Sequence, residues 1–187
     1  MYIFNIIVFS DEFENPNEVL ALKKSLMNLR RFHFVSQYSC SNYLLKITSL
    51  LGPRLKTLCF KILQIVPLEL IFELIESRKS TLKEINFYHC GITDSFLESV
   101  SNIKDLYLRS VILRGCDNIT DRGVKKLIES QKYIRRLDIS SRKLTDKSVS
   151  VICEKLPKIE TLRMNSKGFA DVSLHCQFVI IFFLLFY

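Results

Sequence analysis

The sequence predicts an α/β solenoid in which short parallel strands form one face and helices form the other. Three observations lead to this fold class: a short apolar pattern recurs at near-constant spacing, a polar corner follows it, and helically spaced apolar residues follow the corner. A unit of this size cannot bury its apolar face alone, so neighbouring units must stack.

The recurring pattern consists of three apolar residues, the second three positions and the third five positions after the first, as in Leu82, Ile85 and Phe87. Its first residues lie at positions 3, 29, 55, 82, 108, 134 and 159, so the steps are 26, 26, 27, 26, 26 and 25 residues. Such alternation is typical of a strand with one buried face. We therefore expect about seven repeats, with their strands in one parallel sheet.

A polar corner ending in aspartate follows the later strands, as GITD at 91–94, NITD at 118–121, KLTD at 143–146 and GFAD at 168–171. Apolar residues come three and six positions after each of the first three aspartates. This spacing predicts an amphipathic helix whose first turn is capped by the side-chain oxygen of the threonine or of the aspartate. We expect Asp94, Asp121 and Asp146 to have this structural role.

Residues 1–176 are expected to form one repeat domain, because no linker rich in Gly, Ser or Pro divides them. Residues 177–187 form an apolar tail that leaves the repeat pattern and is about half the length that spans a bilayer. We expect no membrane association and no signal peptide. Because Ile3 is already in register and the tail is not, we expect a fragment or a truncated isoform.

The net charge of +8 and the pI of about 9.2 permit contact with acidic partners or nucleic acid. The basic residues are scattered, so a nucleic-acid partner is not favoured. The six cysteines include no Cys-x-x-Cys pair, and the five glycines make no phosphate-binding loop. The three histidines fall at unrelated positions of the repeat, which does not favour a nucleophile–base pair with Cys153. We expect no enzyme, metal or cofactor.

The repeat resembles the cysteine-containing subclass of leucine-rich repeats, with units of the form LxxLxLxxCxxITDxxLxxL. The segments LKEINFYHCGITDSFLESV and VILRGCDNITDRGVKKLI carry the resemblance, which is good over 82–164, looser over 29–80 and weak before that. Four residues depart from the cysteine of the motif: Gln37, Leu63, Arg142 and Lys167.

This subclass is characteristic of F-box/LRR proteins, the substrate receptors of SCF ubiquitin ligases, and of AMN-type proteins of the mitotic exit pathway. The resemblance implies a non-enzymatic protein-recognition module that acts in ubiquitin-dependent protein catabolism. The alternative is an AMN-like or general scaffold that binds a protein partner without a ligase.

The segment VPLELIFELIES at 66–77 resembles the opening of an F-box. It lies between two strands of the repeat pattern, so a repeat helix is favoured over an F-box. A Skp-type adaptor is then a partner only if an F-box exists outside this chain.

The resemblance also implies that Cys90 and Cys116 are small buried thiols at equivalent corners. Unpaired thiols indicate a reducing compartment, so we expect a cytoplasmic or nuclear protein. The sequon at Asn118 is then not glycosylated, and Asn118 is expected to bridge neighbouring turns.

Side chains between the apolar anchors are expected to point to the concave face, opposite the helices. Arginines there can bind carboxylate or phosphate, and Tyr88 can anchor a peptide. We expect that reversing the charges of Arg114, Arg136 and Arg163 weakens partner binding without unfolding the chain. The opposing interpretation, an ordinary solvated sheet face, stays open. The candidate partner-binding residues are Arg31, His33, Lys61, Glu84, Asn86, Tyr88, Arg114, Arg136, Asp138 and Arg163.

Overall fold

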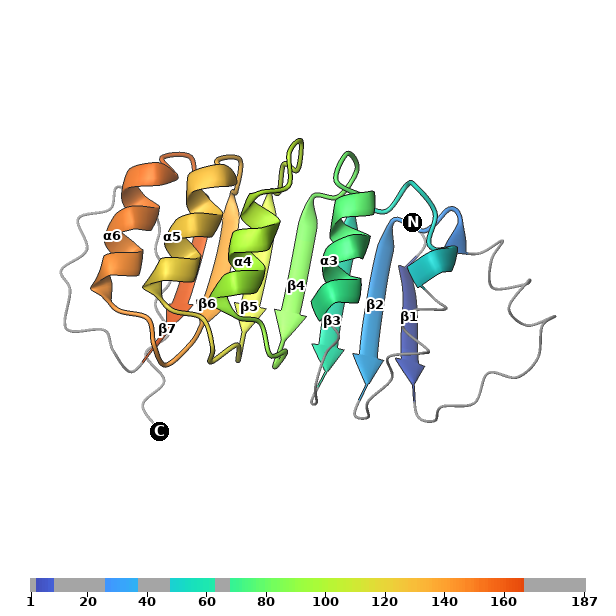
Figure 1. Ribbon diagram of the computed structural model, residues 1–187, viewed down its shortest axis with the longest axis horizontal. Coiled ribbons are helices and arrows are strands. Elements are labelled where there is room, and N and C mark those ends of the chain that lie inside the picture. The colour runs from blue at the N-terminus through green and yellow to red at the C-terminus, as the bar shows by residue number, and fades with distance from the viewer. Residues whose placement is uncertain (1–2, 9–25, 37–47, 63–67, 167–187) are drawn as a thin grey trace.

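The computed structural model describes residues 3–8, 26–36, 48–62 and 68–166, and the predicted apolar tail lies outside these ranges. Seven strands form one parallel sheet in chain order, with helices covering one face (Figure 1). This confirms the predicted α/β solenoid, while the domain limits and the number of repeats stay predictions. The strands are β1 (Ile3–Val8), β2 (Arg31–Ser36), β3 (Thr57–Ile62), β4 (Glu84–Tyr88), β5 (Ser110–Arg114), β6 (Arg136–Ser140) and β7 (Thr161–Asn165).

Four helices pack side by side against that face: α3 (Leu68–Ser77), α4 (Asp94–Ser101), α5 (Asp121–Ser130) and α6 (Asp146–Lys155). Helix α3 contains most of the segment that resembled an F-box opening. It lies between β3 and β4 and buries Ile71, Leu74 and Ile75, as a repeat helix must. None of the helices in the described ranges is long and apolar enough to cross a membrane.

The core lies between the sheet and the helices, and the strand register builds it. Anchor residues of successive strands are direct Cα partners, as in Phe34, Phe60 and Phe87 of β2, β3 and β4. All three rings are fully buried, and Phe87 stacks on Phe60 with centroids 5.8 Å apart. The apolar pattern thus becomes continuous rows of side chains along the solenoid.

The threonine of each corner caps its own helix. Thr93, Thr120 and Thr145 are extended, and their hydroxyls accept the N–H groups of Phe96, Arg122 and Lys147. These bonds, 3.2 to 3.3 Å long, satisfy one of the free donors of each first turn. Of the two oxygens that the sequence left open, the threonine oxygen is therefore the cap.

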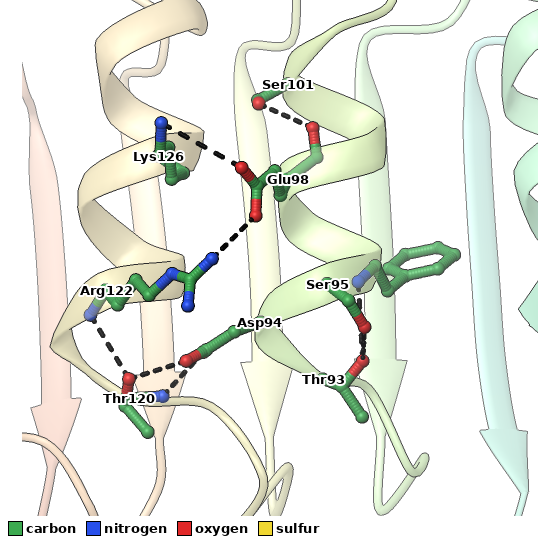
Figure 2. Close-up of polar contacts among 9 residues, drawn as sticks. Thr93, Asp94, Ser95, Glu98, Ser101, Thr120, Arg122 and Lys126 are labelled. Atoms are coloured by element: carbon green, nitrogen blue, oxygen red, sulfur yellow. Dashed lines mark hydrogen bonds and ion pairs between the residues drawn. The ribbon is translucent and has the colours of Figure 1, made fainter.

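The aspartates of the corners bind the next unit instead. Asp94 accepts the N–H of Thr120 at 2.8 Å and its hydroxyl at 2.6 Å, as Figure 2 shows. Asp121 accepts the same two groups of Thr145 at 2.9 and 2.6 Å. We call this series the aspartate ladder. It joins neighbouring units, a structural role for the aspartates that the corner pattern does not predict.

Asp146 of α6 holds the position that corresponds to Asp94 and Asp121, but it makes no hydrogen bond of the ladder within the described residues. One of its carboxylate oxygens, Oδ1, is buried and has no hydrogen-bond partner among the described residues. On the outer surface α4 and α5 are joined more weakly, because Glu98 of α4 pairs with Arg122 of α5 at 3.2 Å and with Lys126 at 3.9 Å (Figure 2). Exposed pairs of this kind contribute little to stability.

Gly123 of α5 makes room for the ladder, since a Cβ at this position would collide with the carboxylate of Asp94. Replacing a helical glycine by alanine ordinarily favours the helix by about 1 kcal/mol. We expect Gly123→Ala instead to lower the free energy of unfolding by about 1–2 kcal/mol, because Asp94 must move off Thr120. Urea unfolding followed by circular dichroism measures this. Gly91→Ala is the matched control, because a Cβ there meets nothing within 4 Å; equal effects of the two substitutions would contradict the explanation.

The corner cysteines Cys90 and Cys116 are buried. Their Sγ atoms donate to the carbonyl oxygens of Phe60 at 3.6 Å and Phe87 at 3.9 Å. Burial, followed by the neighbouring Cys90, raises the pKa of Cys116 to about 12, so its thiol keeps its proton at neutral pH. Each thiol therefore links its corner to the strand of the preceding repeat.

The corner after β6 differs from the expectation that Arg142 replaces the cysteine. Arg142 is exposed, whereas Ser141 is buried and donates its hydroxyl to the carbonyl oxygen of Ile119 at 2.6 Å. This corner is one residue shorter, because it has no counterpart of Gly115, whose φ is +64°. The cysteine position, which lies eight residues after the first anchor in the two preceding repeats, lies seven residues after Ile134 and is Ser141. Asn118 is exposed and pairs with Thr93 in an isolated parallel bridge.

Candidate functional site

The concave face is the sheet face opposite the helices, and its side chains form three rows. The strand register places equivalent positions beside one another, about 4.8 Å apart. From β2 to β7 the first row is Arg31, Thr57, Glu84, Ser110, Arg136 and Thr161. The middle row is His33, Cys59, Asn86, Ile112, Asp138 and Arg163, and the third contains Val35, Lys61, Tyr88 and Arg114, with Ser140 and Asn165 on β6 and β7.

The candidate residues differ in how far they reach solvent. Lys61, Arg114, Arg136 and Arg163 are exposed. Asp138 is only 6% exposed. The partly buried candidates are Arg31, His33, Glu84, Asn86 and Tyr88.

Arg114 and Asp138 form a diagonal ion pair between β5 and β6. Asp138 Oδ2 accepts from Arg114 Nη2 at 2.6 Å and from Nε at 3.0 Å. The hydrogen bond to Asp138 raises the pKa of Arg114 despite partial burial. Because its carboxylate is buried and already bound, Asp138 holds Arg114 in place and does not itself face a partner. This corrects its expected role as a contact residue.

Arg136 and Arg163 lie on the neighbouring strands β6 and β7. Arg163 is the direct register partner of Asp138, but the carboxylate binds Arg114 instead. Within the described residues no ion pair involves Arg136 or Arg163. Two exposed guanidinium groups are therefore available on this half of the concave face, beside a third whose orientation is fixed.

The half formed by β2, β3 and β4 has a different character. Burial, together with the charge of Arg31, lowers the pKa of His33, so the imidazole is neutral at neutral pH. Burial raises the pKa of its register neighbour Cys59 to about 11. A protonated thiol is a poor nucleophile, so these pKa shifts do not favour a catalytic role for the neighbouring histidine and cysteine.

Further along this half, Glu84 accepts the hydroxyl of Thr57 at 3.2 Å. Burial is the main cause that raises the pKa of Tyr88, whose phenol is neutral at neutral pH. Asn86 Oδ1 is buried without a hydrogen-bond partner among the described residues. The structure thus separates a half whose middle row is uncharged, and whose exposed charge is Lys61, from a half with exposed arginines on three neighbouring strands. The row assignment in the sequence does not reveal this difference.

Two further features were not predicted. Tyr107 and Tyr133 are large exposed aromatic residues, and a basic residue precedes each strand from β2 to β6. The second feature was visible as a Lys or Arg next to the first apolar anchor. It lies one position before the strand residues that point to the concave face, so strand alternation does not select it.

Comparison with known proteins agrees with the fold. A family model described as Leucine Rich repeat matches residues 104–127, which include β5, its corner and the start of α5. The chain is 32% identical over 103 residues to Protein NLRC5 of Ictalurus punctatus, covering 53% of this chain and 6% of that protein. The chain therefore spans a small part of the length of this relative. The matches support a leucine-rich repeat protein, and neither concerns an F-box/LRR or AMN-type protein.

Proposed function

We propose that this leucine-rich repeat module binds an acidic segment of a protein partner on the arginine-bearing half of its concave face. Arg114, Arg136 and Arg163 are the contact residues, and Asp138 positions the first of them. The observation that carries the proposal is that three neighbouring strands expose one arginine each, while the nearest carboxylate is buried and paired. Guanidinium groups bind carboxylates with two parallel hydrogen bonds, which supplies both affinity and orientation.

Arg114 is left out of the charge reversal proposed below, because it is paired with a buried carboxylate. Its loss would leave the carboxylate of Asp138 buried and unpaired, at a cost of about 1–3 kcal/mol because the arginine side of the pair is 45% exposed. Arg136 and Arg163 are exposed and make no such pair, so their reversal leaves the fold intact.

We expect Arg136→Glu with Arg163→Glu to weaken partner binding on the order of 10–100-fold. A photo-reactive amino acid at exposed Asn165 of β7 captures the partner in cells, and the yield of that adduct measures binding. Lys125→Glu with Lys147→Glu is the matched control, because it makes the same change in net charge on the helical side. An adduct that is undiminished in the concave-face variant, or equally formed from exposed Ser150 of α6, would exclude this surface.

We further propose, from the resemblance of the repeat, that the module is the substrate-binding part of an SCF-type ubiquitin ligase receptor. Affinity purification of the full-length gene product tests this with a Skp-family adaptor as the readout. Recovery of the adaptor supports the ligase role. A product that binds its partner at the concave face but recovers no adaptor identifies the alternative, an AMN-like or general scaffold without a ligase. For either role we propose a cytoplasmic or nuclear location, supported by the free buried thiol of Cys116, although Cys153 is disulfide-bonded.

A further inference from the structure

A line of like charges crosses the strands at the edge where they begin, uppermost in Figure 1. The residue immediately before each strand from β2 to β6 is basic, and we call these five the basic rim: Arg30, Lys56, Lys83, Arg109 and Arg135. Each member from Lys56 onward donates its backbone N–H to the carbonyl oxygen of the preceding member at 2.8 Å. The five backbones are therefore locked in register, about 4.8 Å apart.

Most of the rim is open to solvent and unpaired. Arg30, Lys56 and Arg109 are exposed, and none of them makes an ion pair with another described residue. The row ends at β7, where Glu160 takes the equivalent position and pairs with Arg135 at 3.2 Å. Four of the five rim cations thus have no acidic partner among the described residues, and three of these four are exposed.

Such a row disfavours folding. Like charges on directly opposed residues of neighbouring strands repel, by up to about 1 kcal/mol at contact distance in water. One position later on each strand, the row from Arg31 to Arg136 includes Glu84 and has mixed character. An unbroken basic row is therefore a local departure of the kind that binding sites show.

We propose that the basic rim binds an acidic helix of a protein partner, laid across the strands with one carboxylate per turn. A helix rises 5.4 Å per turn, and the rim offers a cation about every 4.8 Å. Over four steps the mismatch is about 2.4 Å, which flexible Lys and Arg side chains can span. The proposal uses residues other than those of the concave face, so each proposal can fail alone.

The aromatic residues beside the rim favour a polypeptide over a single-stranded nucleic acid. Nucleic-acid surfaces of this type offer aromatic faces on which bases stack. Tyr107 and Tyr133 are 48% and 63% exposed, but their rings pack edge to face on each other, with centroids 5.4 Å apart. Lys83 Nζ lies 5.9 Å over the ring of Tyr107. The two rings already pack on each other, whereas Arg30, Lys56 and Arg109 make no ion pair with another described residue.

Fluorescence anisotropy with the full chain tests the proposal. The probes are a helical peptide of about 20 residues with one Glu per turn on one face, a scrambled peptide of the same composition, and an oligouridine of about 20 nucleotides. The rim variant is Lys56→Glu with Arg109→Glu, and the control of equal charge change is Lys125→Glu with Lys147→Glu. Lys56→Gln with Arg109→Gln replaces the reversal if thermal unfolding shows that the reversal disturbs the fold.

We expect the parent chain to bind the patterned peptide more tightly than it binds the other two probes. The affinity of the rim variant for this peptide should be about tenfold lower than that of the parent, and the affinity of the control should stay within about twofold of the parent value. Tighter binding of the oligouridine would overturn the proposal in favour of a nucleic-acid surface. Equal losses in the rim and control variants would reduce the effect to net charge and also overturn it. Equal binding of the two peptides, or no saturable binding of either, would do the same.

Discussion

Phe87→Ala is expected to lower the free energy of unfolding by about 3–5 kcal/mol, the largest effect of any substitution considered for this chain. Phe87 is fully buried on β4, where its ring stacks on Phe60 of β3 with an interplanar angle of 9°. It also meets Phe96 of α4 edge to face, with centroids 5.8 Å apart. Removing the ring separates a strand from its neighbour and from its own helix at once. Urea unfolding followed by circular dichroism measures the change.

The matched control is Phe72→Ala on α3, where the ring is only partly buried at the edge of the core. Folding buries less apolar area at Phe72 than at Phe87, and the space left by the missing ring is open to solvent. We therefore expect less than half the effect of Phe87→Ala. In a solenoid each unit is stabilised by its neighbours, so the loss at Phe87 should broaden or split the unfolding transition. A change below about 1 kcal/mol at Phe87 would show that the phenylalanine row does not hold the units together.

The fold could be predicted because burial repeats along this chain with a fixed period. Leu82, Ile85 and Phe87 are all fully buried, and the same three positions recur in each described strand from β2 onward. Periodic burial is a property of spacing alone, which the sequence displays directly. The Thr caps follow from the same cause, since a polar corner before a helical pattern has few alternatives.

The details of the candidate site depend on contacts between units, and spacing does not specify these. Asp138 of β6 is the register partner of Arg163 of β7. Its carboxylate nevertheless binds the guanidinium of Arg114, which lies on β5 one side-chain row away. The row assignment therefore placed Asp138 on the surface although it is buried. Ser141, and not Arg142, occupies the cysteine position, because the corner after β6 is one residue shorter. Both differences are local and leave the repeat pattern unchanged.

The aspartate ladder is the strongest case of a contact between units, and Asp121→Ala should lower the free energy of unfolding by about 2–3 kcal/mol. Asp121 accepts the N–H and hydroxyl of Thr145, and the hydroxyl of Ser148, which is 1% exposed. The substitution leaves the N–H and hydroxyl of Thr145 and the hydroxyl of Ser148 without their acceptor. Water cannot readily replace it at Ser148, because this residue is buried. Urea unfolding at pH 7 measures the loss.

The same contacts make stability depend on pH. Burial alone would raise the pKa of Asp121, but the hydrogen bonds from Ser148 and Thr145 outweigh it and hold the pKa below its ordinary value. A carboxyl group with a lowered pKa in the folded protein adds stability above its unfolded pKa, and that stability is lost as the pH falls through the folded pKa. We therefore expect the difference between the parent and Asp121→Asn to be full at pH 7 and to shrink below about pH 4.

Asp117→Asn is the control for this pH dependence, because it removes the same charge from the same corner. Asp117 is exposed and contacts only Arg142 among the described residues, through a 3.3 Å hydrogen bond and a 3.8 Å ion pair. Pairs of this kind contribute about 0–1 kcal/mol, so the control should differ little from the parent at either pH. If Asp117→Asn and Asp121→Asn lost equal stability, or if the Asp121 difference were the same at pH 3 and pH 7, the hydrogen bonds to Thr145 and Ser148 would not be its cause. A difference confined to Asp121, and present only where its carboxylate is charged, is what contacts between stacked units require.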